Sequence, residues 1–137
     1  MTVKQHALFA YGTLQLPEIT ERIIGRTLPG DAAWLDGYRC GLVARANFPG
    51  ITAAPHCRVP GTLLYGVTQA ELEHLDRYEG ELYRRVRTEV RLSEQDSLIQ
   101  CWVYVIAAWA QARVTDTPWT IEWYRQQGMK GRLTYRY

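Results

Sequence analysis

The chain has 137 residues, of which 47% are hydrophobic and 22% are charged, and its formal net charge is +2. These values predict one globular domain, residues 1–137, and a charge this small argues against a nucleic-acid or membrane partner for the whole domain. The longest apolar run, Cys101 to Ala110, is shorter than the roughly 20 residues that a membrane span needs, and no basic leader precedes a long apolar segment. We therefore expect a soluble, cytoplasmic protein, whose oligomeric state the sequence leaves open.

The three cysteines, Cys40, Cys57 and Cys101, are widely spaced and form no C-x-x-C pair. This pattern argues against a disulfide framework and a structural zinc site, so we expect reduced thiols. No His, Cys or carboxylate cluster has metal-ligand spacing, and we expect neither a metal nor a cofactor. His56 beside Cys57 is an alternative nucleophilic pair, but adjacent side chains on an extended chain point apart.

The stretch from Leu8 to Leu14, with the sequence LFAYGTL, is an apolar strand that leads into a glycine beside a hydroxyl residue. Because glycine has no Cβ, Gly12 can adopt a positive φ and let a substrate approach the main chain, with Tyr11 and Thr13 framing the gap. An ordinary strand end with a turn glycine explains the same residues, so this stretch alone leaves both interpretations open.

The next part of the chain contains short elements separated by glycine and proline. Pro17 suits the first turn of a helix and Gly25 suits the position just after its end. The pattern therefore predicts a short helix over Pro17 to Gly25. A strand follows over Ala32 to Ala44, with a tight turn or bulge at Asp36-Gly37. After a turn over Asn47 to Ile51, we expect a second strand over Val59 to Val67, which Pro60-Gly61 breaks early.

The clearest helix signal begins at Thr68, because Thr68-Gln69-Ala70-Glu71 has the spacing of a capping box. At about 100° per residue, Leu72, Leu75 and Glu79 share the apolar face, and Gly80 can end the helix. Desolvation and the helix dipole both favour the neutral form of a carboxyl group placed there, which suits general acid/base chemistry. The alternative is a frayed last turn with Glu79 in water.

Beyond Gly80, we expect a strand from Tyr83 to Leu92, a hairpin loop over Ser93 to Ser97, and a central strand from Leu98 to Ala107 that is apolar on both faces. Strict alternation along this strand puts Tyr83 on its polar face, at the surface or the rim, unless a bulge changes the direction of the side chain. The alternative is a buried Tyr83 that hydrogen-bonds to the backbone.

In the C-terminal part, Thr117-Pro118 starts a helix with Trp119 and Trp123 on one face. The basic and aromatic tail, Arg125 to Tyr137, is a solvated edge or a binding segment for nucleic acid or an acidic partner.

Three of these stretches together resemble the γ-glutamylcyclotransferase-like family, which includes the γ-glutamylamine cyclotransferases and the plant avirulence-induced proteins. They are Tyr11-Gly12-Thr13-Leu14, then Leu75-Asp76-Arg77-Tyr78-Glu79-Gly80, then Tyr83-Arg84-Arg85. The Phe48-Pro49-Gly50 turn and the strand from Gly61 to Val67 are also similar to the middle of that family. Three motifs in the same order are more specific than any one of them.

The resemblance implies an α+β fold: a small, closed, mostly antiparallel β-barrel of about six strands with a few peripheral helices and one cavity. It implies that Tyr11, Gly12, Thr13 and Leu14 bind a γ-glutamyl substrate and that Glu79 is the catalytic acid/base; Tyr83 is a further substrate-binding candidate. The implied reaction is a cyclisation to 5-oxoproline with release of an amine or amino acid, without metal or cofactor. A non-catalytic member of the same fold, which binds a ligand or a partner, is the alternative.

Overall fold

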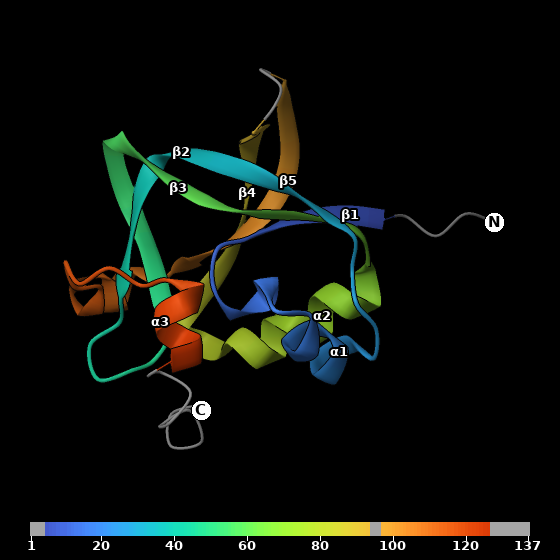
Figure 1. Ribbon diagram of the computed structural model, residues 1–137, viewed down its shortest axis with the longest axis horizontal. Coiled ribbons are helices and arrows are strands. Elements are labelled where there is room, and N and C mark those ends of the chain that lie inside the picture. The colour runs from blue at the N-terminus through green and yellow to red at the C-terminus, as the bar shows by residue number, and fades with distance from the viewer. Residues whose placement is uncertain (1–4, 94–96, 127–137) are drawn as a thin grey trace.

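The computed structural model describes residues 5–93 and 97–126, and Figure 1 shows the arrangement of its elements. The strands are β1 (Gln5–Ala10), β2 (Gly30–Leu42), β3 (Pro49–Thr68), β4 (Tyr83–Leu92) and β5 (Leu98–Ile106). The helices are α1 (Pro17–Ile24), α2 (Gln69–Glu79) and α3 (Ile121–Gln126), with short 3-10 turns η1 (Thr13–Gln15), η2 (Gly80–Leu82) and η3 (Ala108–Arg113).

The strands close into a barrel in the order β1-β3-β2-β4-β5. β1 and β5 pair in parallel at Leu8 and Trp102, and the other neighbours are antiparallel. The prediction of a mostly antiparallel α+β barrel is confirmed, although the described residues form five strands instead of about six. β5 is apolar on both faces, as predicted, because it has a barrel interior on one side and a helix layer on the other.

Successive residues of β1 alternate between these two layers. Phe9 packs inside the barrel in a cluster of strand residues that includes Leu35 and Val103. Leu8 points the other way, into a second cluster that includes Leu72 and residues of α1. The period of two along a strand therefore separates a barrel core from a barrel–helix core.

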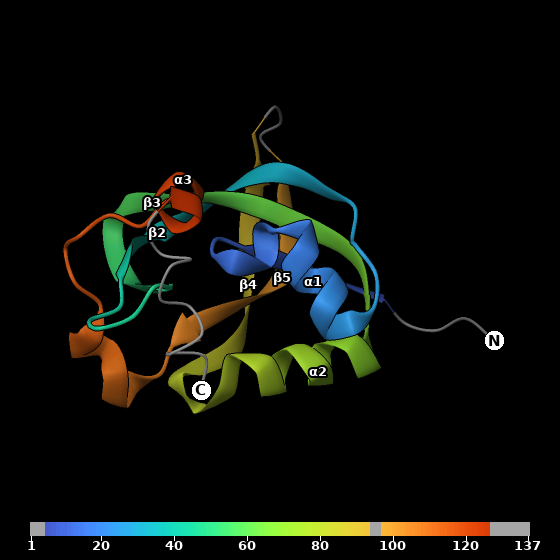
Figure 2. The same cartoon turned by 60° about the horizontal axis from the view of Figure 1, so that its bottom comes forward.

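The helix layer consists mainly of α1 and α2, which lie against each other on one side of the barrel (Figure 2). α1 begins with Pro17 in its first turn and ends at Gly25, whose φ is 82°. α2 has the predicted capping box: the Thr68 hydroxyl accepts from the Glu71 N–H at 3.1 Å, and the Glu71 carboxylate accepts from the Thr68 N–H at 3.0 Å. Local sequence rules thus placed both helix starts correctly.

The middle of the chain differs from the prediction, because β3 runs without interruption from Pro49 to Thr68. The turn lies before Pro49, and its residues 44–48 connect β2 to β3. A proline has no N–H to donate to a neighbouring strand, and β3 places each of its prolines where this matters little. Pro49 is the first residue of the strand, and Pro55 lies in the irregular stretch opposite Gly37. Pro60 precedes the part of β3 that pairs with β1. The predicted bulge at Asp36-Gly37 is confirmed, with a φ of 86° at Gly37.

The C-terminal part also begins differently from the prediction. α3 starts at Ile121, where the Thr120 hydroxyl accepts from the Trp123 N–H, so Trp119 lies outside the helix and does not share a face with Trp123. Trp119 is buried and donates its ring N–H to the Asn47 carbonyl at 3.0 Å. Beyond residue 126 the tail lies outside the described residues, as does most of the predicted hairpin loop. Within the described ranges, no helix has the length and apolar character that crossing a membrane requires.

Candidate functional site

A pocket lies where β1 ends, between the barrel and the C-terminal end of α2. Its empty volume is about 350 Å3, including the part open to solvent. It is lined by Phe9, Ala10, Tyr11, Gly12, Thr13, Leu14, Phe48, Pro49, Glu79, Tyr83 and Tyr104. The six residues that the sequence singled out therefore lie around one pocket, although they come from three separate stretches of the chain.

The loop at the end of β1 forms one wall of the pocket. Tyr11 is buried and donates its hydroxyl hydrogen to the Tyr104 carbonyl at 2.5 Å. η1 begins directly afterwards at Thr13, and the first N–H groups of a helical turn have no acceptor inside that turn. The main chain of Thr13 and Leu14 can therefore offer donors to a ligand in the pocket.

The reason that position 12 is a glycine differs from the prediction. Gly12 has a φ of −115°, which any residue adopts, so no positive φ is required. A Cβ at this position would lie 3.0 Å from Pro49 Cγ and 3.2 Å from Pro49 Cδ, closer than ordinary carbon contacts. A side chain at position 12 would therefore press on the protein's own pocket wall, while the approach of a substrate to the Gly12 main chain stays a prediction.

Glu79 reaches the pocket because of its place on α2. Leu72 and Leu75 are fully buried and fix the apolar face of the helix against the barrel, and Glu79 follows on that face as the last helical residue. Gly80 ends the helix with a φ of 72°, and its N–H bonds to the Asp76 carbonyl. The half-buried Glu79 lines the pocket, so the predicted face is confirmed and the frayed last turn is not observed.

Tyr83 is buried, which corrects the expectation of a surface or rim position. The face of β4 that carries Tyr83 turns toward the barrel–helix core, where the Tyr83 ring lies 6.2 Å from that of Phe48. Its hydroxyl donates to the Pro49 carbonyl at 2.5 Å, so the backbone-bonding alternative describes it. Tyr83 fixes the Phe48-Pro49 wall and lines the pocket itself.

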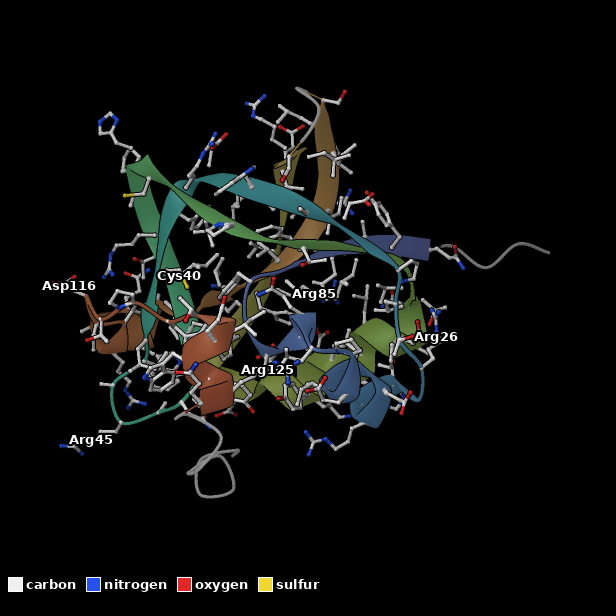
Figure 3. The ribbon with its side chains drawn as sticks, viewed as in Figure 1. Arg26, Cys40, Arg45, Arg85, Asp116 and Arg125 are labelled. Carbon is white, nitrogen blue, oxygen red and sulfur yellow. The ribbon has the colours of Figure 1, made fainter. Side chains whose placement is uncertain are left out.

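A polar network under the pocket ties α2 to β4 and β5. Asp76 accepts from Arg85 at 2.7 and 3.1 Å, and its Oδ1 also accepts from the Tyr104 hydroxyl at 2.7 Å. The Arg85 guanidinium lies 4.2 Å from the centre of the Trp102 ring. Arg85, which is labelled in Figure 3, therefore joins the last turns of α2 to β4, close to Glu79 in the sequence.

This network sets the charge states of its members. Burial raises the pKa of the Tyr104 phenol well above its usual value, and the nearby charges of Asp76 and Glu79 act in the same direction. Burial also tends to raise the pKa of Asp76, but hydrogen bonds from Arg85 and Tyr104 outweigh it and hold that pKa below its usual value. Near neutral pH the phenol therefore stays protonated and the carboxylate stays ionised.

Sequence reasoning missed Phe48, Pro49 and Tyr104 as pocket residues. Phe48 and Pro49 were noted only as part of a turn, and Tyr104 only as part of an apolar strand. Conversely, His56 and Cys57 are exposed in the irregular part of β3, and neither lines the pocket. All three cysteines are unpaired, and burial raises the pKa of the Cys40 and Cys101 thiols to about 12.

Together, the barrel, the glycine loop and the pocket-lining carboxylate define the class: a small α+β barrel protein with a pocket between barrel and helices. The model of the family described as gamma-glutamyl cyclotransferase, AIG2-like, matches residues 8–125, and the chain belongs to this family.

Known proteins agree with this assignment. AIG2-like protein D of Arabidopsis thaliana is 32% identical over 135 residues, which cover 96% of this chain and 87% of the relative. A solution structure of an Arabidopsis thaliana protein, 27% identical, aligns with a TM-score of 0.77 over 99% of this chain and 84% of that one. The structure of a gamma-glutamyl cyclotransferase shares the fold, with a TM-score of 0.65 over 76% of this chain and 68% of that chain, at 20% identity.

Proposed function

We propose that this protein is a cyclotransferase that converts a small γ-glutamyl amine or γ-glutamyl amino acid to 5-oxoproline and releases the amine. The observation that carries the proposal is the meeting of Glu79 with the loop of Tyr11 to Leu14 in one pocket. Membership of a family whose description names γ-glutamyl cyclotransferase supports it.

The proposed reaction is an internal displacement. The Glu79 carboxylate takes a proton from the substrate's α-ammonium, and the freed amine attacks the γ-carbonyl carbon to close a five-membered ring. The bond from that carbon to the leaving nitrogen then breaks as Glu79 returns the proton to this nitrogen. The second proton of the attacking nitrogen passes through solvent to the released amine, so atoms and charge balance.

Each wall of the pocket has a task in this proposal. Main-chain N–H groups at Thr13 and Leu14 hold the oxygen that becomes negative during attack, or the substrate carboxylate. The aromatic walls of Tyr11, Tyr83 and Phe48 exclude water and fix the ring-closing conformation. Because the amine and the carbonyl belong to one molecule, proximity is built into the substrate, and the proposal needs no metal or cofactor.

The test is the variant Glu79→Gln, assayed by 5-oxoproline release from γ-glutamyl amines, γ-glutamyl dipeptides and glutathione. The rate should fall by roughly 10²- to 10⁴-fold, the usual effect of losing a general base. The melting temperature should stay the same or rise, because a neutral amide is less costly to desolvate than a carboxylate.

The matched control is Glu73→Gln, which makes the same change on the exposed face of the same helix and should leave the rate unchanged. If Glu79→Gln keeps the wild-type rate, Glu79 is a structural residue at the end of α2. In that case the non-catalytic binding protein of the same fold becomes the better description.

A further inference from the structure

A second hollow, which we name the outer groove, adjoins the pocket. Its walls come from the loop between β2 and β3, from the C-terminal end of α2 with η2, and from η3. Phe48 lines both the pocket and the groove, and Gly80 in the groove directly follows Glu79 in the pocket. The groove is wider, with an empty volume of about 1650 Å3 including the part open to solvent.

The outer groove is rich in positive charge. The residues that line it include Arg45, Arg77 and Arg113, with Glu81 as the one acidic residue among them. A guanidinium presents planar, paired donors that match the two oxygens of a carboxylate. An anionic group in the groove would therefore find complementary charge on several sides.

The arginines are accompanied by an aromatic side chain that the fold leaves in solvent. Trp109 is 62% exposed, and the Arg113 guanidinium lies 4.9 Å from the centre of its ring. Arg77 is also held in place, with one guanidinium nitrogen 2.7 Å from His74 Nδ1. Exposed tryptophan beside arginine is the composition of binding surfaces, since both residue types are enriched where proteins bind their partners.

Arg45 stands at the outer rim and projects from its loop (Figure 3). Its φ of 64° is in the left-handed region, where a residue other than glycine costs roughly 1–2 kcal/mol. A glycine would make this turn at lower cost, so the side chain at position 45 is not explained by the turn itself.

We propose that the outer groove binds the leaving half of the substrate and selects γ-glutamyl compounds whose leaving amine carries a carboxylate. This inference rests on the proposed function, because it places the γ-glutamyl half of the substrate against Glu79. The carboxylate of the leaving half lies among Arg45, Arg77 and Arg113, and an apolar side chain lies on Trp109. A γ-glutamyl amine without a carboxylate lacks these contacts.

The experiment uses two probes that differ at one group: γ-glutamylleucine, which has a free carboxylate, and γ-glutamylleucinamide, which has a neutral amide instead. Calorimetry on Glu79→Gln, where the proposed reaction is blocked, should show that the carboxylate probe binds about 2- to 5-fold more tightly, the effect of a charged contact at a partly exposed site. Adding Arg113→Gln should remove most of this preference. Adding Arg22→Gln, an exposed arginine on α1, should leave it unchanged.

The results separate the groove from the proposed function. Equal affinity for the two probes, or no binding of either, overturns the outer groove as a carboxylate site, and so does a preference that survives Arg113→Gln and Arg77→Gln alike. Release of 5-oxoproline by the wild-type protein is measured separately with both probes. Release with equal affinities overturns the groove alone. An arginine-dependent preference supports the groove, and the cyclotransferase is overturned if neither these probes nor the substrates of the Glu79 assay release 5-oxoproline.

Discussion

Gly12 gives a quantitative test of the pocket wall. A methyl group at this position would lie 3.0 Å from Pro49 Cγ, whereas carbon atoms in good contact are about 3.5–4.0 Å apart. Pro49 cannot easily retreat, because it is buried at the first position of β3 and its carbonyl is bonded to Tyr83. Gly12→Ala should therefore strain this wall, and the larger Gly12→Val should also fill part of the pocket.

The size of the effect follows from the cost of overpacking, which is typically about 1–3 kcal/mol. We expect a small loss of stability in Gly12→Ala. If the strain is relieved toward the pocket, 1–3 kcal/mol raises KM by roughly 5- to 150-fold, with Gly12→Val at the upper end and still folded.

The assay is the KM for 5-oxoproline release, with a thermal melt of each variant. Gly37→Ala is the control, because it places a Cβ in open space at a φ of 86°, so it should lower stability without changing KM. An unchanged KM in Gly12→Val would refute the reasoning and make Gly12 a purely structural residue.

Three further predictions concern the support of the site. Tyr83→Phe removes the donor to the buried Pro49 carbonyl and should cost about 1–3 kcal/mol of stability in a denaturant titration; an unchanged midpoint would contradict this role. Asp76→Asn should cost about 1 kcal/mol or less at pH 7, the value of a partly exposed ion pair. Because folding lowers the pKa of Asp76, its carboxylate stabilises the fold fully above about pH 4, and this stabilisation is lost as pH falls further. The melting temperatures of the wild type and Asp76→Asn should therefore converge in acid. A difference in melting temperature that stays constant with pH would exclude the Arg85 pair as its cause. Activity should persist in EDTA, and a loss restored by zinc or manganese would refute a metal-free reaction.

Features governed by neighbouring residues could be predicted from the sequence. The capping box at Thr68, the helix end at Gly80 and the bulge at Gly37 depend on interactions within a few residues. The position of Glu79 could be predicted for the same reason, because the period of an α-helix relates it directly to Leu72 and Leu75. The sequence therefore indicated the carboxylate and the loop of the site.

Features that depend on distant residues could not be predicted. The alternation of residues along β4 correctly placed Tyr83 and Arg85 on the same face of the strand. The polar residues of that face suggested that it is exposed, but α2 covers it and supplies Asp76 as the partner of Arg85. Tyr104 reaches the pocket only because β5 closes the barrel beside β1. These placements arise from tertiary pairing, which a single strand's pattern does not contain.

The hydrogen bond from Trp119 to Asn47 spans 72 positions of the chain and ties the pocket wall at Phe48 to a late part of the sequence. The loop that carries Phe48 is also held by the Ala44 N–H bond to Arg113 and by the Thr115 N–H bond to Leu42. The contacts that complete this wall therefore form only after residues 113–119 have been synthesised and docked, although Gly12, Glu79 and Tyr83 are made earlier. Closing such a long loop is entropically slow, so the pocket should be among the later features to assemble during folding.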